Sequence, residues 1–232
     1  MNPLSGVFGE AWGLYRAHWR HFFSIAVVVF LVVAAASILL IALLGWVGAI
    51  LAGLISLIAT FWVQGALIEA VSDVRDGRAD LSVSETYSRV RPKLGTIVVT
   101  GLLLGLAIGV GFVFFIVPGV ILMTIWIAVI PAIVLEDRGI GESFGRSWEL
   151  VKGRFWYVLL TIVLTILLWF GISVVISLLL APLADWLAGL IQQIVGNTIV
   201  IPFVVTVWTL AYYRLKGREE TAATAPEPEP AS

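Results

Sequence analysis

Long apolar runs alternate with short polar segments along the chain, and six of the runs have the length that a membrane-spanning helix needs. About 20 apolar residues in a helix cross the hydrocarbon core of a bilayer, with about 17 as the lower limit. These runs lack the polar stripe that a helix of a water-soluble bundle turns to solvent. The predicted spans are Phe22–Leu44, Trp46–Val71, Thr96–Val117, Gly119–Leu135, Trp156–Leu180 and Trp186–Tyr213.

Very short connections join these spans in pairs. Gly45, Pro118-Gly119 and the stretch from Ala181 to Asp185 separate the two members of each pair. Glycine and proline between apolar runs are strong turn signals. The sequence therefore predicts an all-α fold, an integral membrane bundle of six transmembrane helices in three hairpins.

The composition supports this assignment. The 232 residues are 60% hydrophobic and 12% charged, whereas soluble domains are about half apolar and about 25% charged. The formal net charge of −1 argues against a nucleic-acid partner. The chain has no Cys, which excludes a disulfide framework, a thiolate metal site and a cysteine nucleophile.

The basic residues fix the orientation of the spans. All fourteen Lys and Arg side chains fall at the chain ends or between hairpins, and none falls within a hairpin connection, where Asp185 is the charged residue. Positive residues concentrate on the cytoplasmic side of membrane proteins. We therefore predict a multi-pass protein of the bacterial cytoplasmic membrane with both termini in the cytoplasm.

Three of the cytoplasmic segments share one amphipathic pattern. In each, apolar residues are separated by four, three and four positions, which places them on one face of a helix. The three sets are Phe8, Trp12, Tyr15 and Trp19; Val83, Tyr87, Val90 and Leu94; and Phe144, Trp148, Val151 and Phe155. Each segment precedes a hairpin, so a six-span domain over residues 1–218 is expected to contain three repeats, at about 1–78, 79–138 and 139–218.

Basic positions of the three segments align as well: Arg16 matches Arg91 and Lys152, and His18 matches Lys93 and Arg154. We expect each segment to be a helix in the membrane interface, where Trp and Tyr rings are favoured and basic side chains attract anionic headgroups. The alternative is that the basic side chains serve orientation and solubility alone. The residues predicted to contact lipid or a partner protein are Trp12, Tyr15, Arg16, Trp19, Tyr87, Arg91, Lys93, Trp148, Lys152, Arg154 and Phe155.

Polar side chains at membrane depth gather in the sixth span, where Gln192, Gln193 and Asn197 precede the helix-distorting Pro202. Such groups usually form hydrogen bonds between helices. The functional alternative is a small polar cavity that also includes Gln64. Separately, Glu69 and Glu136 lie at the cytoplasmic ends of the second and fourth spans, where we expect them to pair with Arg side chains of the surface helices.

Candidate chemistry is otherwise sparse. His18 and His21 are spaced to share a helix face, but no third metal ligand is evident beside them, and we predict no metal site, no cofactor and no catalytic residue. No phosphate-binding or triad motif is present. Residues 219–232 are rich in Pro, Ala and Glu, which is typical of a disordered tail, here expected in the cytoplasm.

The stretch from Val117 to Leu159 resembles the signature of the glycerophosphoryl diester phosphodiesterase membrane-domain family. The resemblance is carried by Pro118-Gly119, Pro131, Glu136, Ser143, Ser147-Trp148, Leu150, Lys152-Gly153 and Phe155-Trp156. In that family the membrane module stands alone or precedes a catalytic barrel. We expect no barrel in this chain, so the resemblance implies a membrane module and not an activity.

The sequence therefore favours a non-catalytic multi-pass membrane module that organises lipid or docks a partner at the cytoplasmic face. Two alternatives remain open: a channel or carrier for a small or lipid-like solute, and a membrane enzyme of glycerophosphodiester metabolism. The expected partners are membrane lipids, with anionic headgroups foremost, and a separate protein.

Overall fold

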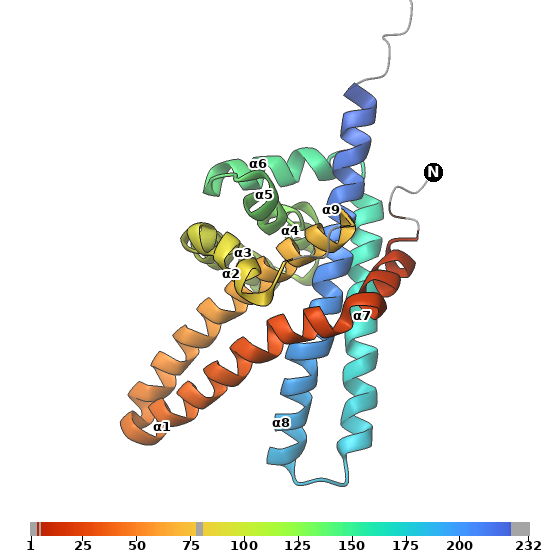
Figure 1. Cartoon of the computed structure of the whole chain (residues 1–232). Coiled ribbons are helices and arrows are strands. Elements are labelled where there is room, and N and C mark those ends of the chain that lie inside the picture. The colour runs from red at the N-terminus through yellow and green to blue at the C-terminus, as the bar shows by residue number, and fades with distance from the viewer. Residues whose placement is uncertain (1–3, 5, 78–80, 224–232) are drawn as a thin grey trace, which may run out of the picture.

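The computed structural model describes residue 4, residues 6–77 and residues 81–223, and all the regular elements of this part of the chain are helices (Figure 1). The α-helices are α1 (Val7–Arg75), α2 (Val83–Val90), α3 (Leu94–Phe114), α4 (Ile116–Ile125), α5 (Val129–Glu136), α6 (Ile140–Val151), α7 (Phe155–Leu180), α8 (Asp185–Val195) and α9 (Ile201–Ala223). A 3₁₀ turn (Arg91–Lys93) joins α2 to α3, and a π-helical turn (Gly196–Val200) joins α8 to α9.

Two bends divide α1 into a surface segment and a hairpin. The backbone leaves the helical region at His18 (φ −121°, ψ 23°), which separates residues 7–17 from the long apolar arm that follows. It then reverses at Gly45 (φ 57°, ψ −127°), where a positive φ favours glycine. The two arms approach so closely that a Cβ atom on Gly48 would lie 1.9 Å from the Leu40 carbonyl oxygen. The turn predicted at Gly45 is thus confirmed, and Figure 1 shows the hairpin.

The second hairpin turns three residues earlier than the sequence predicts. The chain reverses at Phe115, whose backbone is extended, and Pro118 lies in the first turn of α4. The prediction of a turn at Pro118-Gly119 was wrong because a proline in the first turn of a helix loses no hydrogen bond. Gly119 instead permits close packing of α4 on α3, since a Cβ atom there would lie 2.5 Å from the ring of Phe112.

The fourth predicted span is a broken helix, divided at residues 126–128 into α4 and α5. Pro131 explains the break, because it has no N–H for the Ile127 carbonyl and its ring clashes with that carbonyl. The Ser147 hydroxyl of α6 lies at the break, where it donates to the Ile125 carbonyl (2.7 Å) and accepts from the Ala128 N–H (3.1 Å). Ser147 is fully buried, so a side chain from another helix replaces the hydrogen bonds that the break removes.

The third hairpin consists of α7, a short connection and the α8–α9 run. A π-helical turn lies directly before Pro202, in agreement with the distortion that its missing N–H predicts. The Tyr15 hydroxyl of α1 donates to the Ile199 carbonyl within this turn (3.1 Å). At the other end, α9 continues to Ala223, past the expected start of the tail at residue 219. Residues 224–232 of that tail lie outside the described residues.

Five helical stretches of the described chain are long and apolar enough to cross a membrane. They are α1, the run from α2 through α3, the run from α4 through α5, α7, and Thr198–Gly217. The first of these, α1, is itself the hairpin that reverses at Gly45.

The buried core lies where the hairpins meet the surface helices. One cluster joins both arms of α1 to α3, α5 and α9, with Phe22 and Ile97 fully buried. A second cluster joins α6, α7 and α9 around Leu150 and Leu210. Away from this core the apolar side chains are exposed, and α1 diverges from the α7–α8 hairpin in Figure 1. Such bare apolar surface is suited to contact with lipid.

Replacement of Ser147 with Ala should leave two buried backbone groups without partners. Each such group costs about 1–3 kcal/mol, so the free energy of unfolding should fall by about 2 kcal/mol or more, measured by denaturant unfolding in micelles with circular dichroism. The control is Ser143→Ala, one turn away on α6, whose hydroxyl bonds only to its own helix at the Ile140 carbonyl (2.7 Å). Equal losses in the two variants would contradict the assigned role of Ser147.

Candidate functional site

Three surface helices lead into the hairpins: residues 7–17 of α1, α2 and α6. Their starts are fixed by local hydrogen bonds in two cases. In α2 the Ser82 hydroxyl accepts from the Glu85 N–H (3.2 Å) while the Glu85 carboxylate accepts from the Ser82 N–H (2.8 Å), a reciprocal cap. In α6 the Glu142 carboxylate accepts from the Gly139 N–H (3.1 Å).

The predicted aromatic positions of these helices do not share one environment. Trp12 is 57% exposed and Trp148 is 48% exposed, as expected for contact with lipid. Tyr15, in contrast, is only 8% exposed and donates to the π-helical turn. The half-buried Tyr87 donates to the Ile25 carbonyl (2.7 Å). The hydroxyls of the two tyrosines therefore bind the protein itself.

The face that each surface helix turns to the protein carries a small residue. Ala11, Thr86 and Ser147 occupy equivalent positions in the three segments, one residue before the aromatic one, and all three are fully buried. A small side chain lets the surface helix approach the hairpin closely. The periodic pattern coincides with helices in all three segments. Its third position, Tyr15, Val90 or Val151, is buried as well, so the packed face includes part of the pattern and the small residue beside it.

Most basic side chains near these helices are neutralised within the protein. Their ion pairs are Arg75 with Asp76, Arg89 with Glu69, Lys93 with Asp137, Arg214 with Glu10, and Arg138, Arg146 and Lys216 with Glu136. The pairs of Glu69 and Glu136 with arginines of the surface helices confirm the prediction made for those two carboxylates. Lys93 also donates to the Val134 carbonyl (2.5 Å), and Arg154 reaches the Leu150 carbonyl (3.5 Å).

Four cations behave differently. One is Arg20, which is exposed, contacts the Trp19 ring and forms no ion pair in the described part of the chain. The other three occupy one position of the repeat. Arg16, Arg91 and Lys152 are exposed, and none of them forms an ion pair with a carboxylate in the described part of the chain. They are the three residues that align at one position of the repeat, at or near the C-terminal end of each surface helix. Two of them follow an exposed tryptophan by four residues, Arg16 after Trp12 and Lys152 after Trp148. Of the other predicted contacts, Trp19 is also exposed and Phe155 is half-buried.

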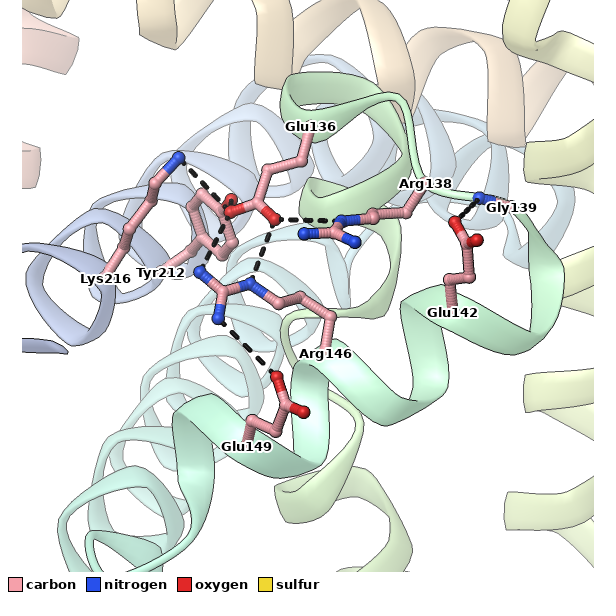
Figure 2. A network of polar contacts seen from close by, with 8 residues as sticks. All are labelled: Glu136, Arg138, Gly139, Glu142, Arg146, Glu149, Tyr212 and Lys216. Carbon is pink, nitrogen blue, oxygen red and sulfur yellow. Dashed lines mark hydrogen bonds and ion pairs between the residues drawn. The ribbon is translucent and has the colours of Figure 1, made fainter. Parts of the chain in front are cut away.

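A polar cluster surrounds Glu136 at the end of α5 (Figure 2). The Arg146 guanidinium contacts both carboxylate oxygens, at 2.9 and 3.3 Å. The Tyr212 hydroxyl donates to the carboxylate at 2.5 Å, and Lys216 approaches the same oxygen at 3.2 Å. Arg138 lies 3.4 Å from the other oxygen. Because one carboxylate faces three cations and a hydroxyl donor, it is held in its charged form.

The Glu136 cluster ties three elements together. Arg146 comes from α6, Tyr212 and Lys216 come from α9, and Figure 2 shows their side chains converging on the end of α5. The side chain of Glu136 is 9% exposed and that of Arg146 is 13% exposed, so the pair is largely removed from water. Sequence analysis missed Tyr212 and Lys216, although their spacing of four residues places them on one helix face.

Gln64 and Gln192, two of the residues predicted to line a polar cavity, do not line a common cavity in the structure. Gln64 lines an apolar cavity of about 70 Å³ beside the α4–α5 break, together with Trp126, Pro131 and Trp208. Gln192 does not line that cavity and accepts instead from the Ser177 hydroxyl of α7 (3.3 Å), which is the interhelical role that a polar residue in a span usually has. The side chains of Gln193 and Asn197 lie outside the described residues.

No group of three or more His, Asp or Glu residues in the described ranges is arranged to hold a metal ion.

Apolar helices of membrane length, a charged layer at one end and surface helices beside it define an integral membrane protein. A model for the membrane domain of glycerophosphoryl diester phosphodiesterase matches residues 99–215, and the chain belongs to that family. The match contains the α4–α5 break, Ser147 and all of the Glu136 cluster except Lys216, which follows directly after it. No curated protein and no solved structure matches the chain.

Replacement of Glu136 with Gln should leave Arg146 largely buried without its counterion. Removal of one partner from a buried ion pair costs about 3–5 kcal/mol, and partial exposure of Arg138 and Lys216 reduces this to about 2–3 kcal/mol. The loss is measured as the change in free energy of unfolding in micelles. Glu149→Gln is the matched control, because Glu149 is 65% exposed and only 3.7 Å from the same arginine. A loss as large at Glu149 would contradict the special role of Glu136.

Proposed function

We propose that the protein is a non-catalytic multi-pass membrane module that gathers anionic phospholipid at its cytoplasmic face. The observation that carries the proposal is the set of three repeat-equivalent cations, Arg16, Arg91 and Lys152, which are exposed and without a carboxylate partner in the described chain. The family match to a membrane domain supports a membrane role without a catalytic one.

The membrane arrangement belongs to this proposal. Six spans form three hairpins, α1 supplies two of the spans through its reversal at Gly45, and α2, α6 and residues 7–17 lie in the interface. The ion pair between Glu10 and Arg214 (2.5 Å) supports a common side for both ends of the chain, because it joins the first surface helix to α9. The positive-inside rule makes that side cytoplasmic, in a bacterial inner membrane.

The three cations favour lipid as the ligand because of where they lie. Each stands at the junction of a surface helix with a membrane span, which is the depth of the phospholipid phosphate. A basic side chain near an anionic membrane surface contributes about 1 kcal/mol of binding. Exposed tryptophans beside Arg16 and Lys152 fit the same layer, since their rings prefer the membrane interface.

Docking of a partner protein is the second candidate, and the same exposed layer would serve it. The family carries the name of a phosphodiesterase, so a separately encoded catalytic chain is the partner to expect. The carrier alternative has less support, because Gln64 and Gln192 lie in different surroundings. The enzyme alternative rests on the family name alone.

The topology predicts which positions a membrane-impermeant thiol reagent reaches. The chain has no Cys, so a single introduced cysteine reports the side of the membrane on which it lies. In spheroplasts of a bacterial expression host, Ala181→Cys in the α7–α8 connection should react at once with an impermeant maleimide. Ser88→Cys on α2 should react only after permeabilisation. Immediate labelling at position 88 would exclude the proposed orientation.

Loss of the three cations should reduce selectivity for anionic lipid. In reconstituted membranes, the variant Arg16→Gln/Arg91→Gln/Lys152→Gln should bind spin-labelled phosphatidylglycerol over phosphatidylcholine about fivefold less selectively at each site. The control, Arg75→Gln/Arg89→Gln/Arg138→Gln, removes the same charge from cations that have carboxylate partners and should retain the selectivity. Equal selectivity in both variants, with loss of a co-purifying protein from the first, would favour partner docking.

A further inference from the structure

Two hollows lie between the first repeat and the α8–α9 run. The upper hollow has a volume of about 280 Å³ and lies at the interface, lined by Trp12, Tyr15, Arg16, Trp19, Phe23 and Ile199. The lower hollow has a volume of about 480 Å³ and lies at membrane depth between the two arms of α1 and the α8–α9 run. A volume of roughly 300–1,000 Å³ is usual for a ligand pocket.

The two hollows have continuous walls. Along the first arm of α1, Phe23 borders the upper hollow and Val27, four residues later, borders the lower one, so they lie on one helix face. On the opposite wall, Ile199 borders the upper hollow and the adjacent Thr198 borders the lower one. The two hollows thus follow one another along the same two elements, and we call the pair the groove.

The lower hollow is suited to hydrocarbon. Small residues on its walls, among them Ala34, Ala52 and Gly53, create its space. Its threonine hydroxyls are occupied within their own helices, since Thr60 donates to the Ser56 carbonyl (2.8 Å) and Thr198 to the Ile194 carbonyl (2.6 Å). Apart from Ser37 and Ser56, an acyl chain would therefore meet mainly methyl and methylene groups along this part of the groove.

The upper hollow is suited to an anion with aromatic neighbours. Arg16 lines it and has no carboxylate partner in the described ranges, while Glu10 of the same helix is engaged by Arg214. The Arg20 guanidinium does not line the hollow but lies 5.7 Å from the centre of the Trp19 ring, which does. Tyr15 closes the back of the hollow through its hydrogen bond to the Ile199 carbonyl (3.1 Å).

We propose that this groove binds one anionic glycerophospholipid, with its phosphate against Arg16 and one acyl chain between the arms of α1 and the α8–α9 run. The site rests on the proposed function, because it is a defined member of the lipid layer that the three cations gather. Beyond the proposed function, the site specifies where the lipid binds, how it is oriented and that one lipid binds at this repeat.

The test uses the full chain in nanodiscs that contain phosphatidylglycerol with a diazirine in its acyl chain. After irradiation, mass spectrometry should find adducts on residues 27–38, 52–60 and 194–198. Gly53→Leu should lower these adducts at least tenfold, because its side chain would enter the hollow. A Cβ atom on Gly53 has no atom within 4 Å, so the substitution is compatible with folding.

Gly105→Leu on α3 is the matched control, since Gly105 is equally open and lies outside the groove. It should leave the adducts unchanged. Arg16→Gln should lower adduct formation with phosphatidylglycerol to the level seen with a phosphatidylcholine analogue. Adducts that persist at full strength in Gly53→Leu would overturn the site, as would wild-type adducts spread evenly over all spans.

The outcomes separate the site from the proposed function. If Gly53→Leu has no effect while the triple cation variant still loses its lipid selectivity, the site fails and the function stands. If Gly53→Leu blocks the adducts while the triple variant keeps its selectivity, the function fails and the groove remains a site for one lipid chain. A disulfide between two chains carrying Ile38→Cys, in place of lipid adducts, would assign the groove to a second copy and would also overturn the proposal.

Discussion

The arrangement depends on the rule that a buried backbone group must have a hydrogen-bond partner. In apolar surroundings an unpaired N–H or C=O costs several kcal/mol, and Pro131 forces such a deficit at the α4–α5 break. The Ser147 hydroxyl of α6 provides the missing hydrogen bonds to the Ala128 N–H and the Ile125 carbonyl. If α6 moved away from the span, these two backbone groups would lose their partner. The neighbouring residue, Arg146, is thereby placed against Glu136. One proline thus fixes α6 on α5, and the Glu136 cluster then adds α9.

The three repeats keep their outward side chains alike and vary the inward ones. In the proposed arrangement the outward cations Arg16, Arg91 and Lys152 all meet the same membrane layer, which would impose one requirement on each. The inward residues meet different neighbours. Thr86 donates only to the Ser82 carbonyl of its own helix, whereas Ser147 in the equivalent position binds another element. The surface helix of the third repeat therefore supports the broken span of the second repeat, whereas the Thr86 hydroxyl makes no such bond to another element in the described part of the chain.

The sequence predicts features that depend on many residues, such as the length of an apolar run and the distribution of charge. It does not predict features that depend on a single contact between distant residues. Hydrophobic length located the apolar helices, and charge location predicted the pairing of Glu69 and Glu136 with arginines. The turn at Phe115 and the break before Pro131 were missed because proline is compatible with the first turn of a helix and fails only further inside one. The convergence of Tyr212 on Glu136 needs the packing of α9 against α5, which no local pattern contains.

The first repeat carries a tyrosine at an inward position where the other two carry valine, and this tyrosine lines the upper hollow. Tyr15 aligns with Val90 and Val151, which have no hydroxyl to donate. Its hydrogen bond to the Ile199 carbonyl holds the first surface helix against the π-helical turn, and this turn exists because Pro202 follows it. The wide turn and the first arm of α1 then stand as facing walls of one hollow. Where valine replaces the tyrosine, in α2 and α6, the surface helix packs mainly on the preceding hairpin, α2 on α1 and α6 on α5.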